Sequence, residues 1–145
     1  KNFNARIVIA AHPSSSYETR HDYFGGRRVI KGKTIELIKK AKFIIAHSSF
    51  STNFAVMFKK PIIFVTTDQL NNSHLGKLNH KLAEMLGKKS TNLDKQFNID
   101  WEFELKVSEE KYLEYKNKYI KKPDTPEFPF WQVAADHFKQ IDIGE

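Results

Sequence analysis

The chain has 145 residues, of which 40% are hydrophobic and 28% charged, with only six Gly and five Pro. This composition excludes a disordered or fibrous chain, and the length fits one globular domain. There is no cysteine, which excludes disulfides and thiolate metal sites, and the apolar runs fall far short of the roughly 20 residues that span a bilayer.

The basic character of the chain narrows the choice of partners. The formal net charge is +7. Such a charge favours anionic partners, namely nucleotide phosphates, nucleic acid or the anionic cytoplasmic leaflet of a membrane. Charge alone does not choose among these three classes.

The first third of the chain predicts a strand, a long loop and a helix. The β-branched run from Arg6 to Ala11 is typical of a buried parallel strand. A polar loop then extends to about Lys31, and loops of this length in compact domains are often functional. Apolar residues at helical spacing predict a helix capped by Thr34 and ending near Ala41.

The same alternation continues in the next segment. Apolar β-branched residues predict strands at 43–46 and 62–66, with a short helix at 52–59 between them. Strands that alternate with helices form parallel βαβ units. We therefore expect an α/β fold, with one Rossmann-like parallel sheet flanked by helices.

The second half predicts further helices and one more strand. Ser73 and Gly87 are suited to begin and end a helix at about 74–86. Strict alternation of apolar and polar residues predicts a strand over 99–107, followed by a helix over 108–120.

The C-terminal segment predicts a linker and an amphipathic helix. Prolines mark residues 123–129 as a linker, and apolar residues at helical spacing follow it, with His137 expected in the core. We expect one domain over residues 1–145, with segment 123–145 packing on it. We also expect the chain to be the C-terminal part of a longer protein.

Two polar segments follow the first two predicted strands. His12-Pro13 comes directly after the first, and Ser48, Ser49 and Ser51 follow the second. Ligands of open α/β sheets bind beyond the carboxyl ends of the strands, where backbone N–H groups and hydroxyls can hold a phosphate. Each segment also has a simpler interpretation, as an ordinary turn or a helix N-cap.

Two common nucleotide-binding motifs are missing from the chain. Neither the glycine-rich dinucleotide fingerprint GxGxxG nor the P-loop pattern GxxxxGK[ST] occurs. The sequence therefore favours neither a Rossmann-type dehydrogenase nor a P-loop kinase.

Three segments, residues 7–13 (IVIAAHP), 43–49 (FIIAHSS) and 55–64 (AVMFKKPIIF), occur in an order that resembles the C-terminal lobe of GT-B glycosyltransferases. The order is similar to that in bacterial capsule and lipopolysaccharide enzymes, such as sialyl- and polysialyltransferases, that share an HP and an SS motif. The resemblance covers roughly residues 5–70. One departure is Asn53, where the related polyglycerol-phosphate polymerases show Asp.

The resemblance implies roles for the residues that match the two motifs. His12, our candidate catalytic residue, is expected to contact the phosphate of a CMP- or UDP-sugar donor, and Ser48 and Ser49 to bind that phosphate from the other side. The implied partners are this donor, a glycan acceptor and an N-terminal lobe of the same chain that holds the catalytic base. The expected location is cytoplasmic, with peripheral contact to the anionic inner membrane face, and no cofactor or metal is expected.

The long loop adds secondary candidates. An arginine can bind a phosphate or a sugar carboxylate, and a glutamate can bind ribose hydroxyls. We include Arg27 and Glu18 in the expected donor site, with Arg27 preferred because it follows two glycines. The alternative is a solvated loop that carries ordinary surface charges, and this loop contains Glu18, Arg20, His21, Arg27 and Arg28. His47 either faces the ligand or points into the sheet.

Two other functions stay open from the sequence. One is a nucleotide-sugar epimerase lobe of the same fold, which would use a comparable phosphate site. The other is a non-catalytic module for nucleic acid, because Lys and Tyr alternate in segment 111–122. Tyrosines at this spacing also suit a packed helix stripe, and we do not expect a nucleic-acid partner.

Overall fold

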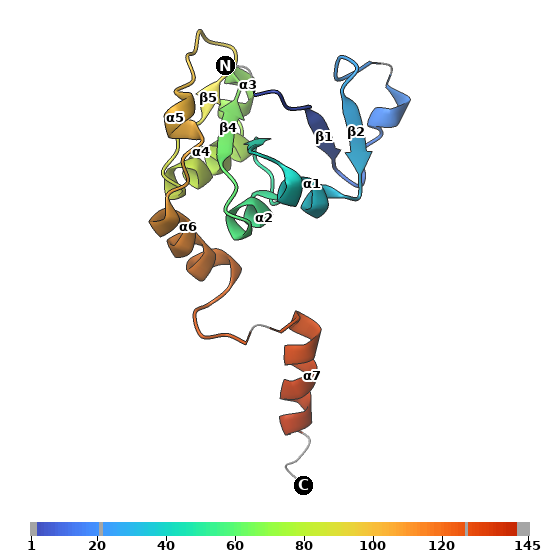
Figure 1. Cartoon of the computed structure of the whole chain (residues 1–145), viewed down its shortest axis with the longest axis vertical. Helices are drawn as coiled ribbons and strands as arrows, with labels where there is room; N and C mark the ends of the chain where they lie inside the picture. The colour runs from blue at the N-terminus through green and yellow to red at the C-terminus, as the bar shows by residue number, and fades with distance from the viewer. Residues whose placement is uncertain (1–2, 21, 127, 142–145) are drawn as a thin grey trace.

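The computed structural model describes residues 3–20, 22–126 and 128–141. It has an α/β fold in which two small parallel sheets are flanked by helices (Figure 1). The expected fold class is confirmed at this level. The expected single sheet is not found, since the strands divide into the pair β1–β2 and the triplet β3–β4–β5.

The first sheet contains a strand that the sequence did not predict. Strand β1 (Val8–Ala11) pairs in parallel with β2 (Arg28–Lys31), so that Val8 lies opposite Arg28 and Ala11 opposite Lys31. Strand β2 and the 3-10 helix η1 (Tyr17–Thr19) lie within the predicted loop. Only two apolar residues separate the basic ends of β2, and this is too short a pattern to indicate a strand.

The second sheet carries the core. Strand β4 (Ile62–Thr66) lies between β3 (Ile44–Ala46) and β5 (Thr91–Asn92), and all three are parallel. Three side chains of β4 are at most 1% exposed, namely Ile62, Ile63 and Phe64. Burying a side chain of this size contributes about 1.5–3 kcal/mol, so β4 is the main source of stability in this sheet.

Four helices complete this part of the fold, and their bounds are α1 (Thr34–Lys40), α2 (Thr52–Met57), α3 (Asp68–Asn71) and α4 (His74–Met85). The predicted cap of α4 is confirmed, because the Ser73 side chain accepts a hydrogen bond from the Gly76 N–H at 3.1 Å. Gly87 ends this helix with φ of +72°, a conformation that favours glycine. Helix α1 instead has Lys33 at its N-cap, so Thr34 is the first helical residue and not the cap.

The predicted strand over 99–107 is wrong. The segment contains the short helix α5 (Trp101–Glu104). The Asp100 side chain caps it by accepting a hydrogen bond from the Phe103 N–H at 3.1 Å. The buried ammonium of Lys88 also binds the carbonyl oxygens of Phe103 and Glu104. These bonds hold the turn and override the alternating pattern.

Helix α6 (Glu109–Tyr115) runs directly into the π-helix η2 (Lys116–Ile120), which confirms a helical segment at the predicted place. Tyr112 ties α6 to the core, since it is 3% exposed and its hydroxyl donates to the Lys60 carbonyl at 3.0 Å. Burial raises the pKa of this phenol above its usual range.

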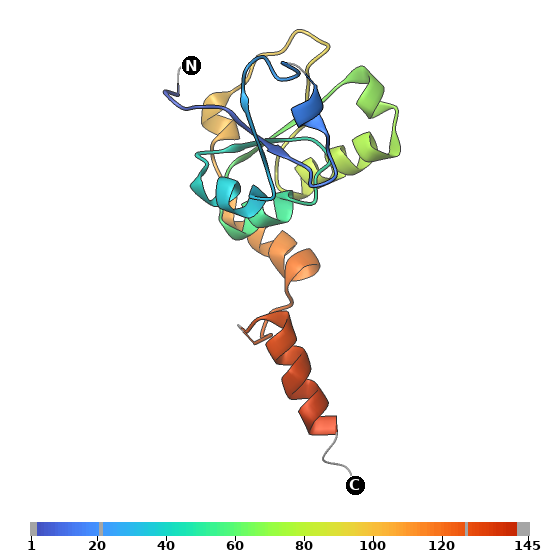
Figure 2. The ribbon, with the colours of Figure 1, turned by 90° about the vertical axis from the view of Figure 1, so that its right-hand side faces the viewer.

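The C-terminal helix α7 (Phe130–Ile141) lies apart from the α/β part (Figures 1 and 2). We expected it to pack on the domain, but none of its residues is buried, and His137 is exposed and not in the core. Segment 123–129 contains three prolines, which interrupt the helix between η2 and α7, and a turn at residues 123–124 follows η2. Within the described ranges no helix is long and apolar enough to cross a membrane.

Candidate functional site

The serine turn after β3 is held in an uncommon backbone conformation. Ser48 has φ of +43°, in the left-handed region. Its N–H donates to the Asn79 side chain at 2.9 Å, and its hydroxyl donates to the Leu75 carbonyl at 3.1 Å. Because α4 takes up both donors, Ser48 anchors the turn and has no donor left for a ligand.

Asn79 is a site residue that the sequence analysis missed. It is 0% exposed, and its amide nitrogen donates to the Val65 carbonyl at 3.0 Å and to the Ser90 hydroxyl at 3.2 Å. Its side chain therefore joins the ends of β3 and β4 to the segment before β5. A signal was present, because Asn79 lies three residues after Gly76 and four before Ala83, on the buried stripe of α4.

The next residues of the turn keep donors available. The hydroxyls of Ser49 and Ser51 lie 2.7 Å apart, so only one of their two protons is used between them. Over the described chain, no acceptor is found for the backbone N–H groups of Ser49 and Phe50. Two N–H groups and one hydroxyl are a suitable donor set for an anion.

The start of α2 contributes less to this donor set than we expected. The N–H groups of Thr52, Asn53 and Phe54 donate to carbonyl oxygens three residues earlier, at 3.1–3.2 Å. They close the turn and are not available to a ligand. The anion-binding capacity therefore lies in the turn itself and not at the end of the helix.

His12 follows β1 and is exposed, as is Pro13. The Ser14 N–H donates to the His12 Nδ1 at 3.2 Å. The Ser14 hydroxyl also lies 2.7 Å from Nδ1. With Nδ1 taken up within its own turn, Nε2 is the ring nitrogen that can donate to a phosphate oxygen. Figure 1 shows β1 beside β2, on the opposite side of the α/β part from α4, the helix that anchors Ser48. Within the described residues no hydrogen bond joins His12 to Ser48, Ser49 or Ser51.

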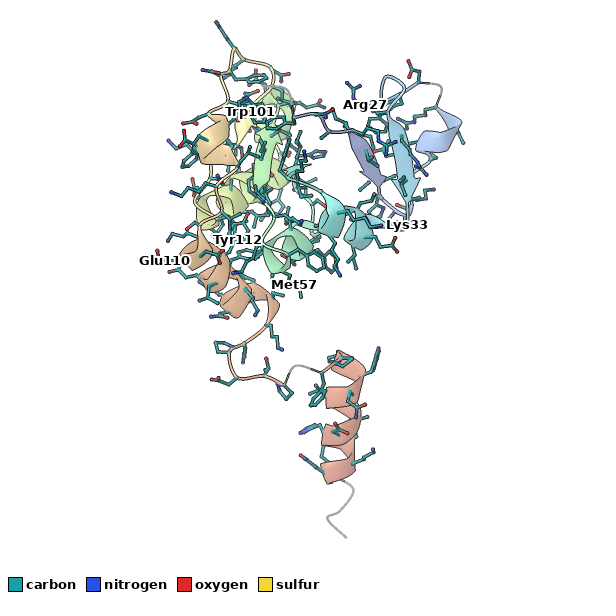
Figure 3. The ribbon with its side chains drawn as sticks, viewed as in Figure 1. Arg27, Lys33, Met57, Trp101, Glu110 and Tyr112 are labelled. Carbon is teal, nitrogen blue, oxygen red and sulfur yellow. The ribbon has the colours of Figure 1, made fainter. Side chains whose placement is uncertain are left out.

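Arg27 is not brought to the carboxyl end of the sheet. Because Val8 pairs with Arg28, Arg27 lies at the amino end of the sheet, separated from His12 by the length of a four-residue strand, about 10 Å or more. Figure 3 shows Arg27 and Lys33 at opposite ends of β2. Arg27 donates instead to the Phe24 carbonyl at 2.9 Å. The expectation that it joins the donor site is therefore not met in this arrangement.

The remaining loop candidates are placed as follows. Arg20 lies over the rings of Tyr17 and Tyr23, with distances of 5.9 and 5.1 Å to the ring centroids. These residues and Arg27 line a pocket of about 430 Å³. Arg28 and His47 are exposed. The side chain of Glu18 and the whole of His21 lie outside the described residues.

A second polar group that the sequence did not indicate lies between α4 and α5. Lys88 and Glu104 are 4% and 8% exposed, and the Lys88 ammonium lies 3.8 Å from the Glu104 carboxylate. Burial lowers the pKa of Lys88 and raises that of Glu104, and their mutual attraction opposes both shifts. Both line a pocket of about 760 Å³, and the buried Glu104 Oε2 has no hydrogen-bond partner within the described chain. Lys88 joins α5 to the end of α4, which is a structural role.

In the part of the chain that the structure describes, no three His, Asp or Glu side chains are grouped to hold a metal ion. Comparison with known proteins gives no matching family model, no matching curated protein and no matching solved structure. The serine turn after β3 is therefore identified as the candidate site from its own geometry.

Proposed function

We propose that this chain is the donor-binding domain of a glycosyltransferase for cell-surface polysaccharide synthesis, and that the turn from Ser48 to Thr52 binds the phosphate of a CMP- or UDP-linked sugar. The observation that carries the proposal is the donor set at the end of β3. It consists of the N–H groups of Ser49 and Phe50, which find no acceptor among the described residues, and the hydroxyl pair of Ser49 and Ser51.

Two further observations support the proposal. The turn follows the carboxyl end of a parallel strand, where ligands of open α/β sheets bind, and the chain has a net charge of +7. The order of the HP and SS motifs resembles that of GT-B enzymes, and it gives the proposal its reaction class. In this assignment the chain is one lobe of a GT-B fold, and electrostatic stabilisation of the departing nucleotide phosphate is its contribution to transfer.

Ser49→Ala is the sharpest test of the turn. The variant removes a hydroxyl that is placed to donate to a charged phosphate, and such a bond is worth about 1.5–3 kcal/mol. We expect the affinity for CMP or UDP, measured by calorimetric titration of the full chain, to fall by about tenfold or more. The Ser49 hydroxyl also accepts from the Ser51 N–H at 3.3 Å, so the free energy of unfolding should fall by about 0.5–1.5 kcal/mol, while both bonds from Thr52 to the Ser49 carbonyl remain.

Ser48→Ala is the matched control. Its hydroxyl donates to Leu75 and not to a ligand, so the variant should lose about 0.5–1.5 kcal/mol of unfolding free energy and keep its nucleotide affinity. Unchanged nucleotide affinity in Ser49→Ala would rule out the serine turn as the phosphate site, and with it the main support for a glycosyltransferase.

His12→Ala tests the other motif. The imidazole is exposed and bonds only within its own turn, so the free energy of unfolding should stay within about 0.5 kcal/mol. Nucleotide affinity should fall because the Nε2 donor is lost. Ser14→Ala removes the hydroxyl that lies 2.7 Å from Nδ1 but keeps the backbone N–H that donates to it, and should therefore weaken nucleotide binding less than His12→Ala does. A loss of stability without a loss of affinity in His12→Ala would make this residue structural.

A further inference from the structure

Helix α7 presents a continuous apolar face that nothing in the described chain covers. At 100° per residue, Phe130, Ala134, Phe138 and Ile141 fall within an arc of about 80°, and Trp131 extends this arc to about 100°. The four large side chains are 61–79% exposed. Phe128 precedes them and is 65% exposed. A contiguous aromatic surface of this kind marks an interaction site.

The segment that precedes α7 is basic. Residues 116–122 read KNKYIKK, with four lysines and no acidic residue. The first acidic residue after this segment is Asp124. A cluster of four or more lysines beside an amphipathic helix is the pattern that binds anionic phospholipid headgroups.

The composition of the face distinguishes among possible occupants. A second copy joined through a coiled coil needs branched aliphatic residues at heptad spacing, whereas this face has a single one, Ile141. Trp and Phe are the residues that settle at the boundary between headgroups and acyl chains. Outside this arc the helix carries two small apolar residues, Ala135 and Val133, and otherwise polar or charged side chains that can remain in water: Gln132, Asp136, Lys139 and Gln140.

We infer that α7 lies in the surface of an anionic phospholipid bilayer, with the lysines of residues 116–122 on the headgroups and the aromatic face in the acyl boundary. The helix stands apart from the α/β part (Figures 1 and 2), so it reaches a surface without any rearrangement of the core. This inference does not depend on the proposed function, since no residue of the serine turn takes part.

The experiment measures co-sedimentation of the full chain with vesicles of phosphatidylcholine alone and of phosphatidylcholine mixed with phosphatidylglycerol. The chain should bind the mixed vesicles and leave the neutral ones in solution. Lys118→Gln with Lys122→Gln should weaken binding about 25-fold, since each lysine near the surface contributes about fivefold. Trp131→Ala with Phe138→Ala should weaken it at least about tenfold. Because α7 has no buried residue and both Lys118 and Lys122 are exposed, these variants leave the core intact.

Gln132→Ala with Gln140→Ala changes the opposite face and is the matched control, with binding unchanged. Equal binding to both vesicle types, binding to neither, or no effect of the lysine variant would overturn the inference. Self-association that the Trp131 and Phe138 changes abolish would identify a second copy as the occupant. In a Trp101→Phe background, Trp131 fluorescence that is already blue-shifted without vesicles would show that α7 packs on its own domain.

Discussion

Replacing Lys88 with methionine should lower the free energy of unfolding by about 3–5 kcal/mol, which is the typical cost of leaving a buried charge without its partner. The variant leaves the Glu104 carboxylate buried and removes the donor to two carbonyl oxygens of α5. Chemical denaturation of the single variant measures the loss directly. A change below about 1 kcal/mol would mean that the pair is solvated in solution.

The double variant separates the charge from the packing. Lys88→Met with Glu104→Leu replaces the pair by apolar side chains of similar size, and such replacements are often neutral or stabilising. We therefore expect the double variant to recover most of the stability that Lys88→Met loses. The difference between the single and double variants gives the coupling free energy of the pair.

The pH dependence of the Lys88→Met variant follows from the direction of the Glu104 shift. Burial raises the pKa of this carboxyl in the folded state, and removing the neighbouring ammonium raises it further. A carboxyl with a raised pKa supports folding below its unfolded value near 4.3, and that support is lost as the pH rises through the folded value. Acidification of Lys88→Met should therefore recover part of its stability, until general acid unfolding begins.

Much of the fold could be predicted because its core elements have long, regular apolar patterns. Strand β4 and helix α4 are examples, and the Ser73 cap and the Gly87 stop lie where local chemistry requires them. Strand β2 and helix α5 could not be predicted. In β2 two apolar residues give no period, and α5 depends on Lys88, a side chain 13 residues before the helix begins. The sequence pattern within α5 does not predict a contact with a side chain so far away in the chain.

The candidate site also has one part that could be predicted from local sequence and one part that could not. The serine turn could be found because hydroxyls follow a strand, and that order is local. The separate tasks of Ser48 and Ser49 could not be found, because they depend on where α4 packs. The expectation that Arg27 lies near the serine turn failed for a related reason. The pairing of β2 with β1, which the sequence did not predict, places Arg27 at the amino end of the first sheet.

Asn79→Leu should lower the free energy of unfolding by about 2–5 kcal/mol and weaken nucleotide binding at the serine turn. The side chain keeps a similar size, but the Ser48 N–H and the Val65 carbonyl lose their partners, and each buried unsatisfied group costs about 1–3 kcal/mol. Binding weakens because Ser48 needs this bond to hold φ at +43°. Asn72→Leu, at an exposed position, is the matched control and should stay within about 0.5 kcal/mol.

Asn79→Asp separates the anchoring of the turn from simple packing. The variant keeps the oxygen that accepts from Ser48 but loses the donor to Val65, and its buried carboxylate lies beside the proposed phosphate position. Burial raises the pKa of such a carboxyl, so stability is present at low pH and is lost as the pH rises through the folded pKa. Nucleotide affinity relative to the unaltered chain should fall over the same pH range, because the carboxylate repels the phosphate. A pH-dependent loss of stability without a parallel loss of affinity would place the phosphate away from the serine turn, while leaving the structural role of Asn79 unchanged.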